Sequence, residues 1–312
     1  MKVSLLHSLM VVVTLAAFST DGQARDNRIY LYVLGVAQDA GYPQSGCYES
    51  HCVPGWKNPA LRRGATSIAV VDGFSGSKYM FDATPDLPEQ LYRLETRAPS
   101  NDYRLNGIFL THAHIGHYTG LMFLGHESMG ASDVPVYAMP RMLQFLSSNG
   151  PWSQLVNYKN IQLKPLRHTQ TQILGRLQVT PFLVPHRDEY SETVGFRIAG
   201  PKKTAVFIPD INKWKDWETR LADLVESVDY ALIDATFFDN DELPGRDMSN
   251  IPHPFVMESM NLLKNLPPEE RGKVWFIHLN HTNPLLNPDS SESQLVRERG
   301  FNIAFEGLEL PL

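Results

Sequence analysis

The sequence predicts a single α/β domain in which strands and helices form separate layers. Short apolar runs rich in β-branched residues alternate along the chain with amphipathic stretches, which is typical of α/β layers and unlike an all-β sandwich. These runs fill both halves of the chain, and no linker rich in Gly, Ser or Pro separates the halves. We therefore expect one domain over residues 25–312, composed of two similar halves.

Ten apolar segments have the length and composition of strands. Several of them end in a His or an Asp, which matters for the site considered below. They are Ile29–Ala37, Thr66–Asp72, Lys78–Asp82, Gly107–Thr111, Val134–Ala138, Leu177–Pro185, Val194–Ile198, Thr204–Pro209, Tyr230–Asp234 and Val274–His278.

Three segments have the pattern of helices. Leu87–Leu94 follows Pro85, and Lys215–Val228 places its large apolar residues on one face at helical spacing. Phe255–Leu266 follows a Pro-His-Pro sequence and ends before Pro267, as expected of a helix bounded by prolines.

The composition narrows the classes of function. The chain of 312 residues has 28 Lys and Arg against 34 Asp and Glu, a net charge of −6, and no basic run forms a stripe along it. Binding to nucleic acid is therefore not expected. With two Cys, the chain is neither a disulfide scaffold nor a four-cysteine metal module.

The first 24 residues have the pattern of a secretory signal peptide. Lys2 precedes an apolar run that ends at Phe18 and is too short to span a bilayer comfortably. Gly22 and Ala24 provide the small residues that a signal peptidase requires, so cleavage is expected before Arg25. An uncleaved anchor is the less favoured alternative. We expect export to the periplasm or the exterior of a bacterium, without stable membrane insertion after cleavage.

The histidines carry most of the functional information. Of eleven, His112, His114 and His117 lie together directly after a predicted strand. An H-x-H sequence at a strand end projects both imidazoles to the same side, because side chains alternate along a strand. Imidazoles arranged in this way bind zinc and similar metals and leave a position open for water. The isolated His126 and His168 are expected to be ordinary surface residues.

Four later residues occupy the same position relative to their own strands. His186, Asp210, Asp234 and His278 each end a predicted strand or follow it directly. Ligand sites of layered α/β folds collect at the carboxyl ends of strands. Asp210 also fits a turn beside a proline, but the metal role is favoured. For Asp234, a ligand and a residue that caps the next turn are equally good interpretations.

These patterns resemble the metallo-β-lactamase superfamily, whose signature is H-x-H-x-D-H followed by a distal His, a bridging Asp and a final His. Within it, the chain is similar to the coenzyme PQQ synthesis protein B group. The resemblance covers nearly all of the chain after residue 24. It implies an αβ/βα sandwich of two mixed sheets flanked by helices. The motifs that carry it are Gly41–Gln44, Phe81–Leu87, Val184–Tyr190 and His278–Pro284.

The resemblance also implies a ligand set. His112, His114 and His186 would form a first metal site, Asp210 would bridge, and His117 and His278 would hold a second ion. Asp210 and His278 would then belong to the catalytic residues.

The chain departs from the signature at Gly116, where the superfamily has its metal-binding Asp. We therefore expect one tightly bound ion per chain, zinc before iron or manganese, since imidazole alone neutralises none of a second cation's charge. His253 and His281 are extra imidazoles that either replace the missing ligand or hydrogen-bond behind it. The PQQ group itself lacks the first His pair and keeps the Asp, so this chain is expected to be an exported paralogue nearer the hydrolases.

The two cysteines lie in one loop. In the resembled group this loop carries a structural zinc ion, whereas here Cys47, His51 and Cys52 give at most three obvious ligands. An oxidising compartment equally permits a Cys47–Cys52 disulfide. Both alternatives remain open.

The function predicted from these features is that of a metallo-hydrolase that attacks a small molecule through a metal-bound hydroxide. Neither a G-x-S-x-G elbow nor a dinucleotide fingerprint is present. One alternative is an iron-dependent oxygenase related to PQQ biosynthesis. The other is a paralogue that binds a ligand without catalysis. Loops 39–60 and 237–255 are expected to line the pocket, whereas the substrate and the oligomeric state are not specified by the sequence.

Overall fold

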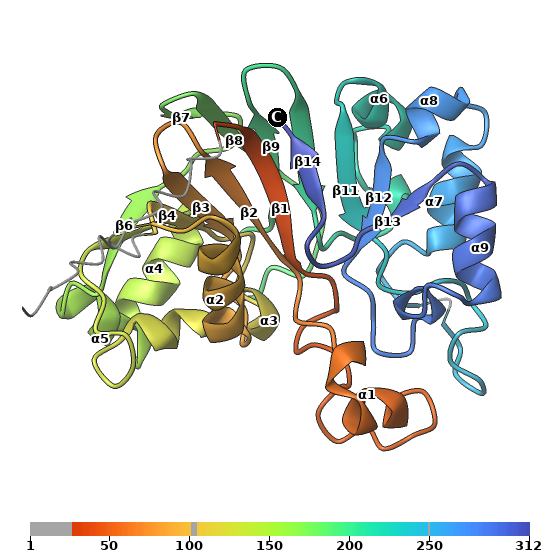
Figure 1. Cartoon of the computed structure of the whole chain (residues 1–312), viewed down its shortest axis with the longest axis horizontal. Coiled ribbons are helices and arrows are strands. Elements are labelled where there is room, and N and C mark those ends of the chain that lie inside the picture. The colour runs from red at the N-terminus through yellow and green to blue at the C-terminus, as the bar shows by residue number, and fades with distance from the viewer. Residues whose placement is uncertain (1–26, 101–104, 249) are drawn as a thin grey trace, which may run out of the picture.

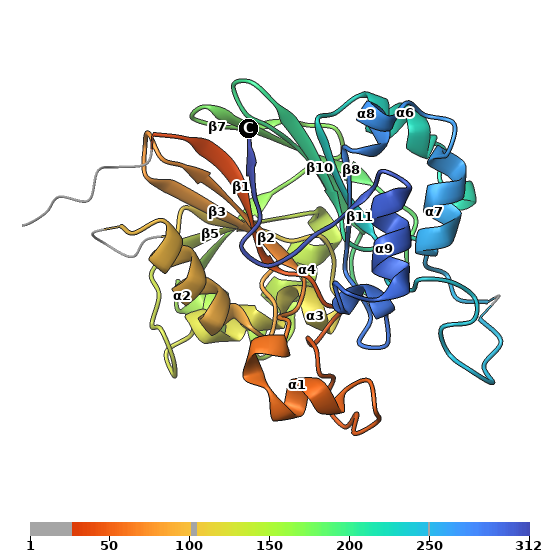
Figure 2. The ribbon, with the colours of Figure 1, turned by 45° about the vertical axis from the view of Figure 1, so that its right-hand side comes forward.

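The computed structural model describes residues 27–100, 105–248 and 250–312. The predicted signal peptide, residues 1–24, lies outside the described residues. Two mixed sheets face each other, and helices cover their outer faces (Figures 1 and 2). This is the αβ/βα sandwich that the sequence predicts.

The first sheet has seven strands in the order β14-β1-β2-β3-β4-β5-β6. The pairs from β14 to β3 are antiparallel, and those from β3 to β6 are parallel. The strands are β1 (Ile29–Gly35), β2 (Ser67–Asp72), β3 (Ser77–Phe81), β4 (Gly107–Phe109), β5 (Val134–Ala138), β6 (Ile161–Pro165) and β14 (Glu309–Pro311).

The second sheet also has seven strands, in the order β13-β12-β11-β10-β9-β8-β7. The pairs from β7 to β10 are antiparallel, and those from β10 to β13 are parallel. The strands are β7 (Gln172–Leu174), β8 (Leu177–Leu183), β9 (Val194–Ala199), β10 (Thr204–Ile208), β11 (Tyr230–Asp234), β12 (Val274–Ile277) and β13 (Asn302–Ile303).

The helices divide between the two sheets, and α1 projects away from the sandwich (Figures 1 and 2). Helices α2 to α5 lie on the side of the first sheet, and α6 to α9 on the side of the second. Their bounds are α1 (Val53–Lys57), α2 (Leu87–Arg97), α3 (Ile115–Tyr118), α4 (Pro140–Ser148), α5 (Trp152–Asn157), α6 (Leu221–Glu226), α7 (Val256–Leu263), α8 (Pro268–Arg271) and α9 (Ser291–Glu298).

Aromatic side chains fill the space between the sheets. The rings of Phe81 and Phe109 stack at 5.0 Å between centroids, and Phe196 meets Phe81 edge-on at 5.3 Å. All three side chains are fully buried, so the central strands have no water-facing side at this level. Each sheet packs against its own helices through one further apolar core. Together these cores fix the strand ends from which the candidate site is built.

The structure confirms the ten predicted strands to within a few residues, but it differs from the prediction in three respects. Six helices of the described residues were not predicted: α1, α3, α4, α5, α8 and α9. The predicted helix 215–228 is shorter, because Trp214–Asp216 forms a 3₁₀ turn and Trp217 is extended, so α6 begins at Leu221. Four strands were not predicted: β6, β7, β13 and β14. All four are two to five residues long, and they include the outer strand at each end of both sheets, where little apolar patterning is needed.

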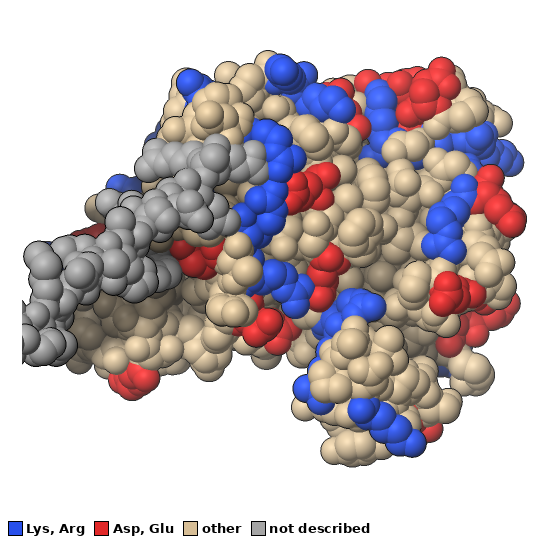
Figure 3. Space-filling view, viewed as in Figure 1, with Lys and Arg blue, Asp and Glu red and all other residues tan. Residues whose placement is uncertain are grey.

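Charged side chains are spread over the surface. On the face drawn in Figure 3, basic and acidic side chains are interspersed among uncharged ones. Among the described residues, none of the helices is long and apolar enough to cross a membrane.

Candidate metal centre

Three imidazoles and one carboxylate converge at the ends of strands from both sheets. His112 and His114 follow β4, His186 follows β8, and Asp210 follows β10. The Nε2 atoms of His112 and His186 each lie 3.2 Å from Asp210 Oδ2, and His114 Nδ1 lies 3.9 Å from it. We call these four residues the inner cluster. Three nitrogens and one oxygen around a common point form a donor set suited to zinc and similar cations.

A second group of possible ligands lies next to the same carboxylate. Asp39, His117 and His278 each offer one ligand atom, and these atoms lie within 4.8 Å of one another. We call these three residues the outer cluster. His117 Nε2 is 3.7 Å from Asp210 Oδ2, so this oxygen is close to ligand atoms of both clusters. The structure thus brings together all six predicted ligands: His112, His114, His117, His186, Asp210 and His278.

Hydrogen bonds on the far side of the rings fix which nitrogen faces the centre. The hydroxyl of Thr111 donates to Asp82, so the 2.9 Å hydrogen bond between this hydroxyl and His112 Nδ1 must be donated by the imidazole. Thr236 does the same for His278: it donates to Asp234 at 2.7 Å and accepts from His278 Nδ1 at 3.0 Å. In both rings Nε2 is left with its lone pair.

The remaining rings are held in a similar way. His117 Nδ1 donates to Asp82 at 2.7 Å, and His186 Nδ1 is 3.2 Å from the side-chain oxygen of Asn212. His114 Nε2 lies 3.4 Å from a carboxylate oxygen of Glu189. Partners of this kind orient imidazoles toward a metal and set their tautomer.

Several atoms at this centre lack a hydrogen-bond partner. Within the described part of the chain, these are His117 Nε2, His278 Nε2 and Asp210 Oδ1, and all three belong to buried side chains. A buried polar atom without a partner costs about 1–3 kcal/mol. A cation at the centre would satisfy such atoms, so the residues present fit a metal ion.

The protonation states also suit metal binding. Burial lowers the pKa of His112 well below its usual value, reinforced by the nearby His117, and burial lowers the pKa of His278. Burial would raise the pKa of Asp210, but His253, His186 and His278 outweigh it and hold the pKa well below its usual range. Neutral imidazoles beside an ionised carboxylate are the forms that bind cations.

His117 differs from the other rings. Burial acts to lower its pKa, but the carboxylates of Asp82 and Asp210 outweigh burial and raise the pKa to about 9. A cation at Nε2 therefore has to displace a proton from this ring near neutral pH.

Three residues around the centre have backbone conformations that are rare outside glycine. The φ angles of Asp39, Asp82 and His278 are +41°, +67° and +68°. Left-handed backbone at such residues costs roughly 1–3 kcal/mol each and is concentrated at functional sites. The observation favours a functional role for this group of side chains.

His253 and Asp234 lie behind Asp210. His253 Nδ1 is 2.9 Å from Asp234 Oδ2 and 3.2 Å from Asp210 Oδ1. Burial acts to lower the pKa of His253, but Asp234 and Asp210 outweigh it and raise the pKa to about 9. Asp234 accepts the backbone amides of Ile211 and Thr236, which is the turn-capping role considered for it. Through Nδ1, His253 hydrogen-bonds behind the centre.

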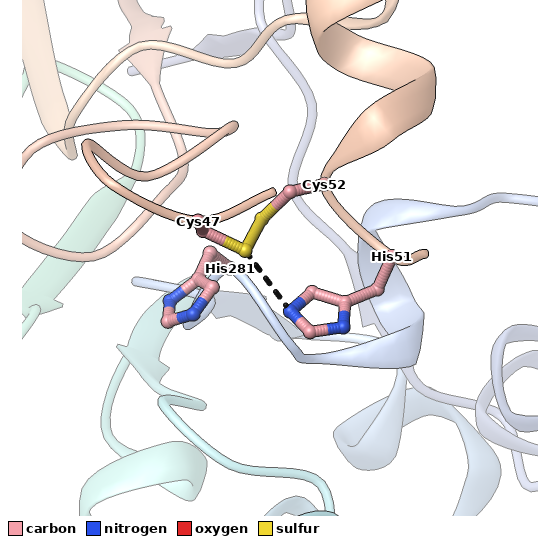
Figure 4. Close-up of side chains that lie close together, drawn as sticks. All are labelled: Cys47, His51, Cys52 and His281. Atoms are coloured by element: carbon pink, nitrogen blue, oxygen red, sulfur yellow. Dashed lines mark hydrogen bonds between the residues drawn. A yellow bond between two sulfur atoms is a disulfide. The ribbon is translucent and has the colours of Figure 1, made fainter. Parts of the chain in front are cut away.

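The second extra imidazole, His281, lies beside the cysteine loop (Figure 4). The structure joins Cys47 and Cys52 in a disulfide, and Cys47 Sγ is 3.3 Å from His51 Nε2. The rings of His51 and His281 are 5.5 Å apart. Of the two alternatives for the cysteines, the structure contains the disulfide.

A depression beside the centre has a volume of about 870 Å³ and is lined partly by His186, Phe182 and Trp217. The sequence favours loops 39–60 and 237–255 as pocket walls, whereas the lining of this depression comes from residues 168–224. His126 and His168 are exposed, as expected of surface residues.

The sequence did not identify Asp39, Asp82, Thr111 or Thr236 as site residues. Asp82 and Thr111 end predicted strands, so the signal that identified His186 was available for them too. Asp39 follows β1 in the same way, two residues before the Gly41–Gln44 motif.

The chain is similar to known proteins over most of its length. The profile described as "Beta-lactamase superfamily domain" matches residues 77–279. Coenzyme PQQ synthesis protein B of Xanthomonas axonopodis pv. citri (strain 306) is 27% identical over 307 residues, which cover 90% of this chain and 99% of that protein. The protein of the same name from Methylorubrum extorquens (strain PA1) is 26% identical, with 91% and 100% covered.

Solved structures share the fold. A Zn²⁺-bound PqqB from Methylobacterium extorquens has a TM-score of 0.76 and 24% identity, covering 91% of this chain and 100% of its own. A diphosphatase from the PhnP family has a TM-score of 0.64 and 22% identity, covering 91% and 97%.

Proposed function

Since the chain belongs to the β-lactamase superfamily, we propose that it is a metal-dependent hydrolase of a small molecule. The observation that carries the proposal is the inner cluster. His112, His114 and His186 present one nitrogen each toward Asp210 Oδ2, within 3.2 to 3.9 Å. Both His of the H-x-H motif belong to this cluster. Contacts on the far side of each ring orient it and set its tautomer.

The four residues of the inner cluster would hold the more tightly bound ion. Zinc suits this nitrogen-rich donor set best, and iron or manganese also bind imidazole with carboxylate. When bound, such an ion lowers the pKa of a coordinated water toward neutrality and polarises a carbonyl or phosphoryl oxygen.

The side chains around the cluster have separate tasks. Asp210 directs Oδ2 at the imidazoles, while its Oδ1 faces His253 Nδ1 at 3.2 Å. Asp234 holds His253 in turn, at 2.9 Å. In the proposed reaction, Asp210 and His278 act at the centre itself, whereas His253 maintains the orientation of Asp210.

An oxygenase is the second candidate, because the curated relatives are named for the synthesis of coenzyme PQQ. Three imidazoles and a carboxylate also suit non-haem iron. A paralogue that binds a ligand without catalysis is the third. The metal found in protein purified from its native compartment separates the first two, because zinc favours hydrolysis and iron favours oxygen chemistry.

The test of the first candidate uses His112→Ala and His186→Ala, with His126→Ala as the control on an exposed histidine that does not line the depression beside the centre. We expect both inner-cluster variants to lose bound metal and hydrolysis of a panel of lactones, thioesters and phosphodiesters. The control should keep both. Full metal retention by a variant that combines His112→Ala with His186→Ala would refute the assignment. Oxygen consumption without hydrolysis would favour the oxygenase.

Export remains part of the proposal. The Cys47–Cys52 disulfide supports it, because disulfides persist in oxidising compartments. Mass measurement of the exported protein should find Arg25 at its N-terminus, and an intact Met1 would contradict a cleaved signal. A small-molecule substrate, and no nucleic acid, is the expected partner.

A further inference from the structure

We propose that Asp39 supplies the carboxylate of a second metal position, in place of the one that Gly116 cannot provide. The outer cluster of Asp39, His117 and His278, with Asp210 shared, would then hold a second cation. The inference rests on the proposed metal-dependent function, and it extends that function to a ligand far from the histidine motif in the sequence.

The backbone of Asp39 occupies the space that a side chain at position 116 would need. A Cβ built on Gly116 would lie 2.4 Å from Asp39 Cα and 2.5 Å from the Asp39 carbonyl oxygen. Real Cβ atoms do not approach backbone so closely, so the loop fits only because residue 116 is glycine. The lack of a side chain at position 116 therefore allows the loop that carries Asp39 to approach the histidine motif.

The side chain of Asp39 faces the two outer imidazoles. Its Oδ1 lies 3.7 Å from His117 Nε2, and the ligand atoms of Asp39, His117 and His278 lie within 4.8 Å of one another. The Asp39 side chain is 52% exposed, whereas His117 and His278 are buried. Asp39 thus closes the outer cluster from the solvent side.

The imidazoles are oriented toward the same space. Asp82 holds His117 Nδ1, and Thr236 holds His278 Nδ1. The opposite atoms, His117 Nε2 and His278 Nε2, have no hydrogen-bond partner among the described residues. Two buried and unpartnered nitrogens beside a carboxylate form the ligand set of a divalent cation.

Backbone hydrogen bonds hold Asp39 close to His278. The amide of Gln38 donates to the Leu279 carbonyl at 2.8 Å, and the amide of Leu279 donates to the Val36 carbonyl at 2.8 Å. The first of these bonds joins the residues directly adjacent to Asp39 and His278, and the second ties Leu279 to Val36 in the same loop. The carboxylate is therefore placed by the β1 loop itself rather than by a long flexible side chain.

Charge decides how tightly a second ion binds. Two imidazoles neutralise none of the charge of a dication, which is why the motif alone predicts a single tightly bound ion. Asp39 adds a full negative charge, and Asp210 contributes a share of another. With these carboxylates counted, two ions per chain are expected.

The experiment is a metal count on metal-free protein reloaded with Zn²⁺, together with calorimetric titration and the absorption spectrum after loading with Co²⁺. The variants are Asp39→Asn and the control Glu49→Gln, which removes one charge from an exposed residue of the neighbouring loop. We expect two ions in the wild type and in the control. In Asp39→Asn the second ion should bind about 100-fold more weakly or worse, since the loss of outer-shell partners alone costs roughly 10–100-fold. The affinity for the first ion should be the same as in the wild type.

A wild type that binds one ion, or an Asp39→Asn variant whose second ion binds as in the wild type, would overturn the inference. Neither outcome touches the proposed function, because the first ion would still depend on His112. Loss of both ions in Asp39→Asn, with the melting temperature unchanged, would also contradict the division into two positions. Failure of the proposed function would appear differently, as an ion count that His112→Ala does not alter.

Discussion

Thr111 and Thr236 each connect a buried carboxylate to a metal-facing imidazole. Each hydroxyl has one proton, which it donates to Asp82 or to Asp234, so each hydroxyl accepts from the imidazole beside it. The tautomer of each metal-facing imidazole is thus set by a threonine and a carboxylate that lie behind the ring. A network of this kind orients ligands at little cost, because every buried polar atom behind the ring is satisfied.

Replacing either threonine with valine tests this arrangement. The shape is kept, but the acceptor for His112 or His278 is lost. We expect Thr111→Val to weaken the inner ion and Thr236→Val the outer ion, each by roughly 10–100-fold. Calorimetric titration measures both, with the exposed Thr96→Val as control. Unchanged affinities in both variants would mean that the hydroxyls do not set the tautomers.

Gly116→Ala tests the close approach of the β1 loop. The added methyl would meet the backbone of Asp39, so we expect a loss of about 1–3 kcal/mol in the free energy of unfolding. We also expect the second ion to be lost while the first is kept. Gly272→Ala is the matched control, since the nearest atom to its added Cβ is 3.4 Å away. Equal denaturation midpoints for the two variants would contradict the contact.

The predicted ligands of the inner cluster share one property. His112, His114, His186 and Asp210 lie at strand ends, and a strand end can be found from apolar patterning alone. Asp39 lies at a strand end too, yet its role depends on a glycine in another loop. Such a relation between distant loops has no local pattern, which is why the sequence predicts one ion and the structure leads us to propose two.

At the scale of elements, the loop after β11 carries a half-buried acid, Glu242, that the centre does not use. Burial raises the pKa of Glu242 to about 7, although hydrogen bonds from Thr282 and the Phe238 amide favour the charged form. The pKa is thus above the ordinary value of 4.5. The unfolded chain therefore releases this proton at lower pH than the folded chain does.

The free energy of unfolding should fall as the pH rises from about 4.5 to about 7. The contribution of Glu242 is fully present below about pH 4.5 and is lost as the pH approaches and passes 7. The loss is at most about 3 kcal/mol for a shift of this size. Denaturant unfolding at several pH values should show this decline in the wild type and in the exposed control Glu89→Gln, and a shallower one in Glu242→Gln. Parallel pH profiles for all three proteins would refute the assignment.

Patterning predicted the central elements and missed the outer ones for a physical reason. Strands such as β2 and β10 are almost wholly buried, so both of their faces must be apolar. Their sequences therefore consist mainly of apolar residues, which makes these strands predictable. The outer strand β7 is exposed or half-exposed throughout, and β13 has two residues. Pairing with a neighbour defines such strands, and pairing partners cannot be seen in a short segment.

At the scale of the molecule, the candidate centre joins the two halves of the sandwich. His112, His114 and His117 follow a strand of the first sheet, whereas His186, Asp210 and His278 follow strands of the second. A cation bound by both sets would add a further link between the two halves, beside the hydrogen bond from the Val194 amide to the Thr111 carbonyl. Binding to the folded chain alone must also stabilise it by mass action.

Metal should therefore raise the melting temperature. A ligand present at about 100 times its dissociation constant stabilises the folded state by roughly 2.7 kcal/mol. Scanning calorimetry of metal-free protein with and without Zn²⁺ should show a clear upward shift, and His186→Ala should reduce it strongly. A shift of the same size in that variant would place the stabilising ion elsewhere.

Anomalous diffraction at the zinc absorption edge tests the central claim most directly, using crystals of metal-free protein reloaded with Zn²⁺. We predict a strong peak among His112, His114, His186 and Asp210, and a second beside Asp39, His117 and His278. Zinc found at Cys47, His51, Cys52 and His281 with none among the inner cluster, or no peak at all, would contradict this prediction.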